Sequence, residues 1–389
     1  MNRHGLVLLA LLVNMVCYTD RVCISIAAPS MREEMGLSPA QMGFVFSIFS
    51  LSYFLGQTPW GILADRRGAR GLVTSAILGW SSFTALTAAA WSYVSLLGIR
   101  FVFGGLEAAL SPSVAQSFRV WVPERSRASA FGFFLGGGRM GGAITPLIAV
   151  AIMTRFGWRS MFVIFGALGI AAAAAWFTLY RNGPAPMVEK GASVIPYRSR
   201  RLWCLLAVAF GSTFMWQFYI TWFPTYLIEK RGFELKEAAW YAGIPFAVGV
   251  VGTWLGGLMT DLLGRRYGTR AARRIVGSFS LSSGALLMIA GLLTEERRLA
   301  AALIGLAALG VDLYLGAAWT TALDIGGASG GAVAGLMNAS SNCAGFASPA
   351  VMGWVLGRWH DWNTVLLVSA AATLLSAVVW LGANPKTES

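Results

Sequence analysis

Six ionisable residues interrupt stretches of sequence that are otherwise apolar enough to be buried in lipid: Asp20, Arg21, Arg100, Glu107, Arg139 and Asp312. Charge at membrane depth is costly, so such residues face a cavity or pair with one another. A guanidinium can hold a carboxylate through two parallel hydrogen bonds. A carboxyl group whose surroundings alternate between a dry and a cation-bound state can take up and release a proton. The six residues therefore predict either an anion and proton site or a static salt-bridge network.

The spacing of these residues restricts which of them can act together. Arg100 and Glu107 are seven positions apart, about two helical turns, so they share a face and Arg100 is expected to tune Glu107 or pair with it. Neighbours on a helix point about 100° apart, so Asp20 and Arg21 each need a partner of their own. Arg139 offers a further cation.

Asp312 is the only carboxylate inside an apolar stretch of the second half of the chain. It is either a second protonatable group, one side of a salt bridge, or a cap at a helix break between Gly310 and Gly316. Asp324 stands at the inner end of the same stretch and is expected to make a structural contact to the next helix.

The composition indicates a membrane protein. The chain has 389 residues, of which 56% are hydrophobic and 12% charged, and its mean hydropathy is +0.63. A soluble domain carries about 25% charged residues. The formal charge of +13 lies mainly in short loops, where positive charge sets membrane orientation, so nucleic acid is not an expected partner.

Apolar runs of about 20 residues predict membrane-spanning helices. Twelve are expected, and the fold class is an all-α polytopic membrane protein with two six-helix bundles. The expected spans are 6–28, 39–63, 71–91, 94–118, 128–153, 158–180, 202–228, 237–263, 273–293, 299–323, 329–356 and 363–384.

The longest polar segment lies at the midpoint and divides the chain into an N-terminal bundle (1–180), a cytoplasmic linker (181–201) and a C-terminal bundle (202–389). With the N-terminus inside the cell, eighteen Lys and Arg fall in cytoplasmic segments and nine in outer ones. Both termini are therefore predicted to be cytoplasmic.

A similar motif follows the second span of each half: "GILADRRGAR" and "GGLMTDLLGRRYGTR". Glycine lets neighbouring helices approach closely, and an aspartate can accept hydrogen bonds from arginines or from a helix N-terminus. Two copies at equivalent positions favour a conformational latch over ordinary positively charged loops. The proposed latch residues are Gly61, Asp65, Arg66, Gly68, Arg70, Asp261 and Arg265.

These motifs resemble those of the major facilitator superfamily, and four further stretches resemble its anion:cation symporter family. The stretches are "YTDRVCISIAAPSM", "RFVFGGLEAALSPSVAQSFRVWVPERSRASA", "TWFPTYL" and "ALDIGGASGGAVAGLMNASSNCAGFASP". The resemblance implies two bundles around a central cavity, alternating access, and an organic anion carried in with protons. The family includes bacterial transporters of galactonate, hexuronates and glucarate. The resemblance therefore implies a multi-pass protein of the bacterial inner membrane.

The resemblance also implies roles for individual residues. Arg21 matches the arginine that binds the substrate carboxylate, and Asp20 and Glu107 match the proton-coupling pair of galactonate transporters. Gly138 stands where those transporters have a glutamine, so galactonate itself is not the expected substrate. Arg139, one residue later, is either a candidate substrate contact, which would suit a dicarboxylate or a more acidic anion, or a cation that balances Asp20 or Asp312.

Uncharged side chains in the spans could bind the hydroxyl groups of a sugar acid, although buried amides more often bond another helix. The candidates are Tyr18, Tyr53, Gln217, Tyr219, Asn338 and Asn342. The resemblance places the two asparagines on the C-terminal side of the cavity.

Other classes of protein fit less well. An enzyme is not expected, because the sequence has no nucleophile elbow, no phosphate loop and no metal-spaced His/Cys set, and "GGGRMGG" lies in an apolar span where helix packing explains it. No cofactor beyond a proton gradient and no metal is expected. The closest alternative is a proton-driven drug exporter of the same superfamily, and a receptor or scaffold is the third. The expected partners are a small organic anion, protons and lipid, with the monomer as the functional unit.

Overall fold

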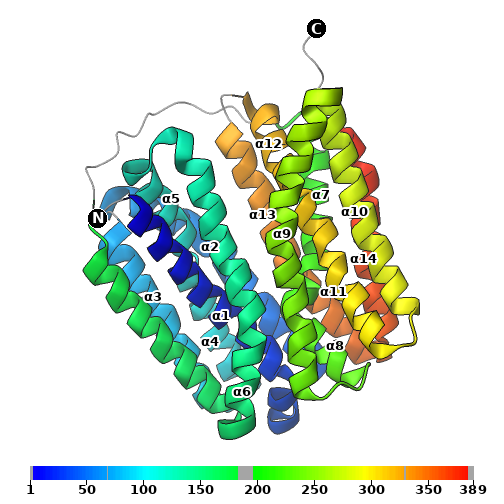
Figure 1. The fold of residues 1–389 in the computed structure, drawn as a ribbon. Helices are drawn as coiled ribbons and strands as arrows, with labels where there is room; N and C mark the ends of the chain where they lie inside the picture. Colours follow the sequence, from blue (N-terminus) through cyan, green and yellow to red (C-terminus); the bar gives the residue numbers. More distant parts are fainter. Residues whose placement is uncertain (1–2, 68, 183–195, 328–329, 384–389) are drawn as a thin grey trace. The chain divides into compact units, whose positions relative to one another are not determined.

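The computed structural model describes residues 3–67, 69–182, 196–327 and 330–383, without the side chains of 58, 62, 65–67, 119, 124–129 and 330–332. All regular structure in this part of the chain is helical (Figure 1). Ten stretches within it are long and apolar enough to cross a membrane. The chain divides into two compact units, Met1–Glu189 and Lys190–Ser389.

The first unit contains six α-helices and one short 3-10 helix. They are α1 (Arg3–Met35), α2 (Pro39–Arg67), α3 (Ala69–Leu86), η1 (Thr87–Ala89), α4 (Tyr93–Glu107), α5 (Leu110–Trp121) and α6 (Glu124–Leu179). The two spans expected at 128–153 and 158–180 both lie within the range of α6, which consists of two helices separated by a kink. Its backbone turns at Gly157, where φ is +79°, a conformation that glycine adopts without steric cost.

The second unit contains eight α-helices. They are α7 (Arg200–Thr221), α8 (Phe223–Glu229), α9 (Leu235–Tyr267), α10 (Thr269–Leu293), α11 (Arg297–Leu313), α12 (Leu315–Gly326), α13 (Gly330–Trp359) and α14 (Trp362–Ala383). In this unit α10 packs against α9, α11 and α14, and α7 packs against α13 and α14. α13 is not among the ten apolar stretches, so the count of twelve spans stays a prediction.

Three of the expected spans are each divided between two helices, and only for the third did the sequence offer a break as one alternative. The span at 94–118 divides into α4 and α5, the span at 202–228 into α7 and α8, and the span at 299–323 into α11 and α12. Pro112, three residues into α5, explains the first break, because it has no backbone N–H to offer the carbonyl of Ala108 one turn earlier. Pro224 at the start of α8 has the same effect at the second break.

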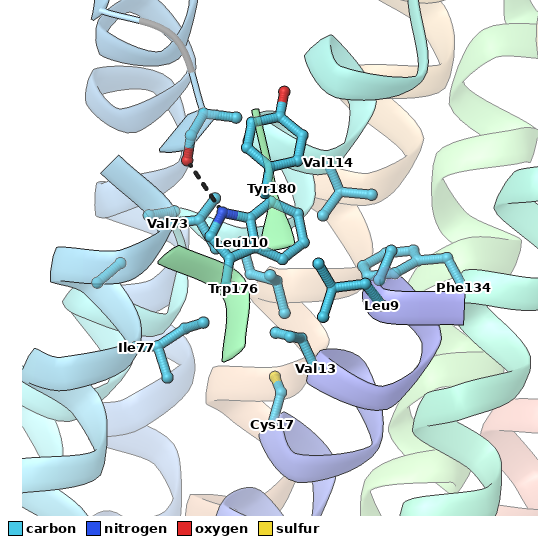
Figure 2. Close-up of a cluster of buried hydrophobic side chains, with 14 of the residues drawn as sticks. Leu9, Val13, Cys17, Val73, Ile77, Leu110, Val114, Phe134, Trp176 and Tyr180 are labelled. Carbon is cyan, nitrogen blue, oxygen red and sulfur yellow. Dashed lines mark hydrogen bonds between the residues drawn. The ribbon is translucent and has the colours of Figure 1, made fainter. Parts of the chain in front are cut away.

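The core of the first unit is apolar and aromatic (Figure 2). α1 contributes Leu9 and Val13, α3 contributes Val73 and Ile77, and the end of α6 contributes Trp176, all of them buried. The Trp176 indole N–H donates to the backbone oxygen of Ala69, 3.4 Å away, so even this apolar cluster satisfies its buried donor. The core fixes α1 against α3 and α6, and α1 carries the charged residues Asp20 and Arg21.

Candidate functional site

Arg21 of α1 forms an ion pair with Glu107, the last residue of α4. The Arg21 Nε donates to Glu107 Oε1 at 3.0 Å, and Nη2 donates to the same oxygen. The Glu107 side chain is fully buried and that of Arg21 is 17% exposed. Because α4 ends at Glu107, the broken helix places this carboxylate opposite α1.

Three aromatic rings surround the Arg21 guanidinium. Its Cζ lies 4.9 Å from the centre of the Tyr18 ring, 4.9 Å from Phe49 and 5.0 Å from Tyr53. Each distance is within the range of about 6 Å at which a ring face attracts a cation. The three rings stabilise the buried positive charge, and the N–H groups of the guanidinium stay available to a carboxylate. The structure thus brings together four of the candidate residues, Arg21, Tyr18, Tyr53 and Glu107, and adds Phe49.

Asp20 points away from Arg21. Its Oδ2 accepts a hydrogen bond from the Trp80 indole of α3 at 3.2 Å, and the residue is 1% exposed. The prediction that Asp20 and Arg21 have separate partners is therefore confirmed. Asp20 and Glu107 are two buried carboxylates with different hydrogen-bond partners, a neutral indole for the first and a cation for the second.

Arg100 faces rings instead of the carboxylate expected for it. Its Cζ lies 4.5 Å from the centre of the Phe103 ring and 5.0 Å from that of Phe49. In the described part of the chain Glu107 is bonded to Arg21, so direct pairing of Arg100 with Glu107 is not the arrangement found. The Phe49 ring of α2 lies against this face of α4.

The glycines of "GGGRMGG" pack α6 against α1, as predicted. A methyl group on Gly137 would lie 2.3 Å from the Leu11 carbonyl oxygen, and one on Gly141 would lie 2.3 Å from that of Met15. A methyl on Gly138 would lie 2.6 Å from the Tyr18 ring. The missing side chain at 138 therefore makes room for Tyr18. Arg139 is half-buried on the same helix.

Asp312 is fully buried at the break between α11 and α12. The break falls at Tyr314, between Gly310 and Gly316 as predicted, and the Tyr314 N–H donates to the Asp312 backbone oxygen. The side chain stands close to α9, because a methyl on Gly252 would lie 3.0 Å from the Asp312 Cβ. Glu107 and Asp312 thus both stand at the end of a helix that breaks inside a span.

The amide and hydroxyl candidates of the second unit make contacts within and between helices. The Tyr219 hydroxyl donates to the Ile304 oxygen at 2.8 Å, and Gln217 Nε2 donates to the Gly345 oxygen at 3.2 Å. Asn342 Nδ2 donates to the Asn338 oxygen at 2.9 Å, one turn earlier on α13. Tyr219 is buried, whereas Gln217 and the two asparagines are half-buried.

The proposed latch is described only in part, since Asp65, Arg66 and Gly68 lie outside the described side chains. Arg70 joins α3 to the end of α6: its Nε donates to the Phe177 oxygen at 2.9 Å, and its backbone N–H donates to Asn182 Oδ1 at 2.9 Å. A methyl group on Gly61 would meet only Pro112, at an ordinary 3.8 Å.

In the second copy of the motif Asp261 and Arg265 are exposed on α9. Close approach through glycine is confirmed at Gly256, where a methyl group would lie 2.0 Å from the Leu313 oxygen. Asp324 pairs with Arg273 of α10, so the contact expected with the next helix is instead to an earlier one.

Sequence reasoning missed Phe49 and Trp80. Phe49 precedes Tyr53 by one helical turn, and this spacing places both rings on one face of α2, so the choice of Tyr53 could have pointed to it. Trp80 carried no such signal, because its contact with Asp20 depends on how α3 packs against α1.

This arrangement of apolar helices, divided spans and a buried ion pair is typical of a membrane transport protein. The family model for the Major Facilitator Superfamily matches residues 10–340, and the chain belongs to that superfamily. A probable sulfoacetate transporter of Cupriavidus necator is 34% identical over 99% of this chain and 94% of its own. A hexuronate transporter of Bacillus subtilis is 30% identical over 97% of this chain and 93% of its own.

The same comparisons confirm the resemblance to galactonate and glucarate transporters. A probable L-galactonate transporter of Escherichia coli is 28% identical over 96% of this chain and 87% of its own. Among solved structures, a bacterial homologue of the human lysosomal transporter Spinster, in an inward-facing and occupied conformation, matches with a TM-score of 0.85. It is 21% identical and covers 98% of this chain and 96% of its own, so it supports the fold. The protein is a transporter and not an enzyme.

Proposed function

We propose that the protein is a proton-coupled symporter that imports a small organic anion by alternating access. The substrate class is a sugar acid, such as a hexonate, hexuronate or aldarate, or a related carboxylate or sulfonate. The proposed location is the bacterial inner membrane, with both termini cytoplasmic and the monomer as the working unit. The observation that carries the proposal is the buried Arg21–Glu107 ion pair.

Competition for Arg21 supplies the coupling. An ionised Glu107 occupies the guanidinium and, with Asp20 ionised beside it, repels an incoming anion. When Glu107 takes up a proton, Arg21 can offer its N–H groups to the substrate carboxylate. One negative charge then replaces another on Arg21, and the proton travels with the substrate. Loss of the proton restores the internal pair and releases the anion.

Arg139 suits a substrate with a second acidic group. Sulfoacetate, named for the Cupriavidus relative, carries a sulfonate and a carboxylate, and aldarates carry two carboxylates. An anion of this kind needs two cations to offset its desolvation. We therefore include doubly charged acids, together with the monocarboxylate sugar acids, among the candidate substrates.

The first experiment is a thermal-shift screen of the purified protein against sulfoacetate, D-glucuronate, D-galactonate and D-glucarate. It is run at about pH 5.5 and about pH 7.5, because a ligand that binds only the folded protein raises its melting temperature. The expected result is a shift with at least one acid, larger at the lower pH and lost in Arg21→Ala. A shift with lipophilic cations instead of acids would favour the drug-exporter alternative.

A further inference from the structure

The face of α4 that carries Arg100 and Glu107 has a notch between them. Gly104 lies four residues after Arg100 and three before Glu107, so the three positions share this face. A methyl group on Gly104 would lie 2.4 Å from Ser52 Oγ, 2.5 Å from the backbone oxygen of Phe49 and 2.9 Å from the Phe49 Cδ2. The backbone and ring of Phe49, together with Ser52 one turn later, therefore pack into the face of α4 between Arg100 and Glu107.

The Phe49 ring lies against two cations. The Cζ atoms of Arg21 and Arg100 are 4.9 Å and 5.0 Å from its centre. Arg21 goes on to bond Glu107. The buried Nε of Arg100, within the part of the chain that the structure describes, has no hydrogen-bond partner.

We infer that Phe49 is a positioning residue that separates Arg100 from Glu107 and thereby assigns this carboxylate to Arg21. The inference rests on the proposed function, because it concerns which cation releases Glu107 when substrate binds. Arg and Glu side chains two turns apart, about 10 Å along the axis, are long enough to meet if nothing lies between them. A buried guanidinium is strongly stabilised by a carboxylate partner, so Arg100 would take Glu107 if the ring were absent.

The other titratable groups near Glu107 do not compete with Arg21 and Arg100 for its carboxylate. Tyr18, Cys17 and Asp20 of α1 and Tyr53 of α2 also interact electrostatically with the Arg21–Glu107 pair, and none of them is a cation. Arg100 in turn interacts electrostatically with Asp20 and Cys23 of α1. The choice for Glu107 is therefore between Arg21 and Arg100. If Arg100 held it, Arg21 would stay open to an anion whether or not Glu107 was protonated, and anion binding would lose its dependence on pH.

The test is the pH dependence of anion affinity in Phe49→Leu. Sulfoacetate and D-glucuronate are titrated calorimetrically into detergent-purified protein at about pH 5.5 and about pH 7.5. A wild-type affinity ratio of at least about tenfold is expected, because one linked proton changes the affinity by up to about tenfold per pH unit. Phe49→Leu should reduce this ratio to about twofold or less. Phe49→Tyr, which keeps the ring, should retain the wild-type ratio. Phe49→Met serves as a second variant if the leucine variant does not fold.

Two further variants separate positioning from general loss of packing. Phe103→Leu removes a ring that lies against Arg100 but not Arg21, and should keep the wild-type ratio. Phe49→Leu combined with Arg100→Gln should regain pH dependence, because the competing cation is gone.

Three results would overturn the inference: an unchanged ratio in Phe49→Leu, an equal loss in Phe103→Leu, or no recovery in the double variant. If wild type itself binds neither acid, or binds both without any dependence on pH, the proposed function fails as well. A different result, in which the anion affinity of wild type and that of Phe49→Leu depend equally on pH, would overturn the inference about Phe49 and leave the proposed function standing.

Discussion

Asp20 and Glu107 are buried carboxylates in one helical unit, yet their neighbours suit them to different tasks. In the proposed mechanism Glu107 competes with the entering anion for Arg21, to which it is paired in the structure, so its protonation would decide whether the cation is open. Asp20 accepts a hydrogen bond from the neutral Trp80 indole and is not paired with Arg21. In the same mechanism it would act on an incoming anion through its charge alone. We therefore assign direct competition to Glu107 and electrostatic adjustment to Asp20.

Glu107→Gln should separate coupling from binding. Glutamine keeps the shape of the side chain but cannot take up a proton, so the variant resembles the protonated state permanently. In proteoliposomes, uptake driven by a pH gradient should fall to background, while exchange of internal for external substrate should persist. Binding should also become less sensitive to pH. An unchanged pH dependence in this variant would remove Glu107 from the coupling mechanism.

The types of the site residues could be predicted from the sequence, whereas their partners could not. A charged residue in an apolar run is visible without a structure, because it violates the pattern around it. Glu107 pairs with Arg21 and not with Arg100, and we attribute this choice to the Phe49 ring that lies at Gly104. Phe49 and Gly104 lie on two different helices and are 55 positions apart in the sequence. No helical spacing contains this information.

At the scale of elements, helix ends were predicted better than helix breaks. The ends of α9 and α14 follow from polar residues that flank apolar runs, and the expected spans 237–263 and 363–384 lie close to the observed bounds. The breaks before α5, α8 and α12 are apolar on both sides, so hydropathy passes over them. Proline explains the first two. At the third, the glycines around Asp312 gave the only signal.

The contact between α1 and α6 depends on glycines at particular positions. Gly141→Ala would place a methyl group 2.3 Å from the Met15 oxygen, and overpacking of this kind costs roughly 1–3 kcal/mol. Gly136→Ala, on the same helix, meets nothing within 4 Å and should change stability by less than about 0.5 kcal/mol. Apparent melting temperatures of the two variants in one detergent would measure the difference. Equal values would contradict the close approach of these helices.

Asp361 begins α14 as a helix cap with a pH-dependent contribution. A hydrogen bond from the Thr364 hydroxyl, joined by the backbone N–H groups of Asn363 and Thr364, lowers the pKa of Asp361. Because the folded pKa is depressed, the stabilisation is present above the unfolded value of about 3.9 and is lost as pH falls through the folded value. Asp361→Ala should therefore lower the melting temperature near neutral pH, and this difference should shrink in acid.

Asp361→Asn is the matched control for the cap, because asparagine keeps an acceptor oxygen without the charge. It should melt between wild type and Asp361→Ala near neutral pH. A gap between wild type and Asp361→Ala that stays constant down to the acid range would show that the carboxylate charge plays no part.

At the scale of the whole chain, each of the two units contains a broken helix with a buried acid at its end. Glu107 closes α4 before α5 begins, and Asp312 stands one residue before the end of α11, ahead of α12. Interrupted helices at corresponding positions of two halves are typical of transporter sites. This repetition supports a role for both acids near the middle of the membrane. It could be predicted only for Asp312, whose flanking glycines suggested a break.

The orientation of the chain follows from the distribution of its positive charge and can be measured directly. Cytoplasmic loops retain Lys and Arg, so Arg198 is predicted inside the cell and His360 outside. In a variant without the four native cysteines, single cysteines at these positions would be treated with a membrane-impermeant maleimide on intact cells. His360→Cys should react at once, and Arg198→Cys only after permeabilisation. The cysteine-free protein must still bind its acid for the comparison to hold. Labelling of Arg198→Cys on intact cells, with His360→Cys protected, would show that the chain has the opposite orientation. The helices that carry Glu107 and Asp312 would then cross the membrane in the opposite direction.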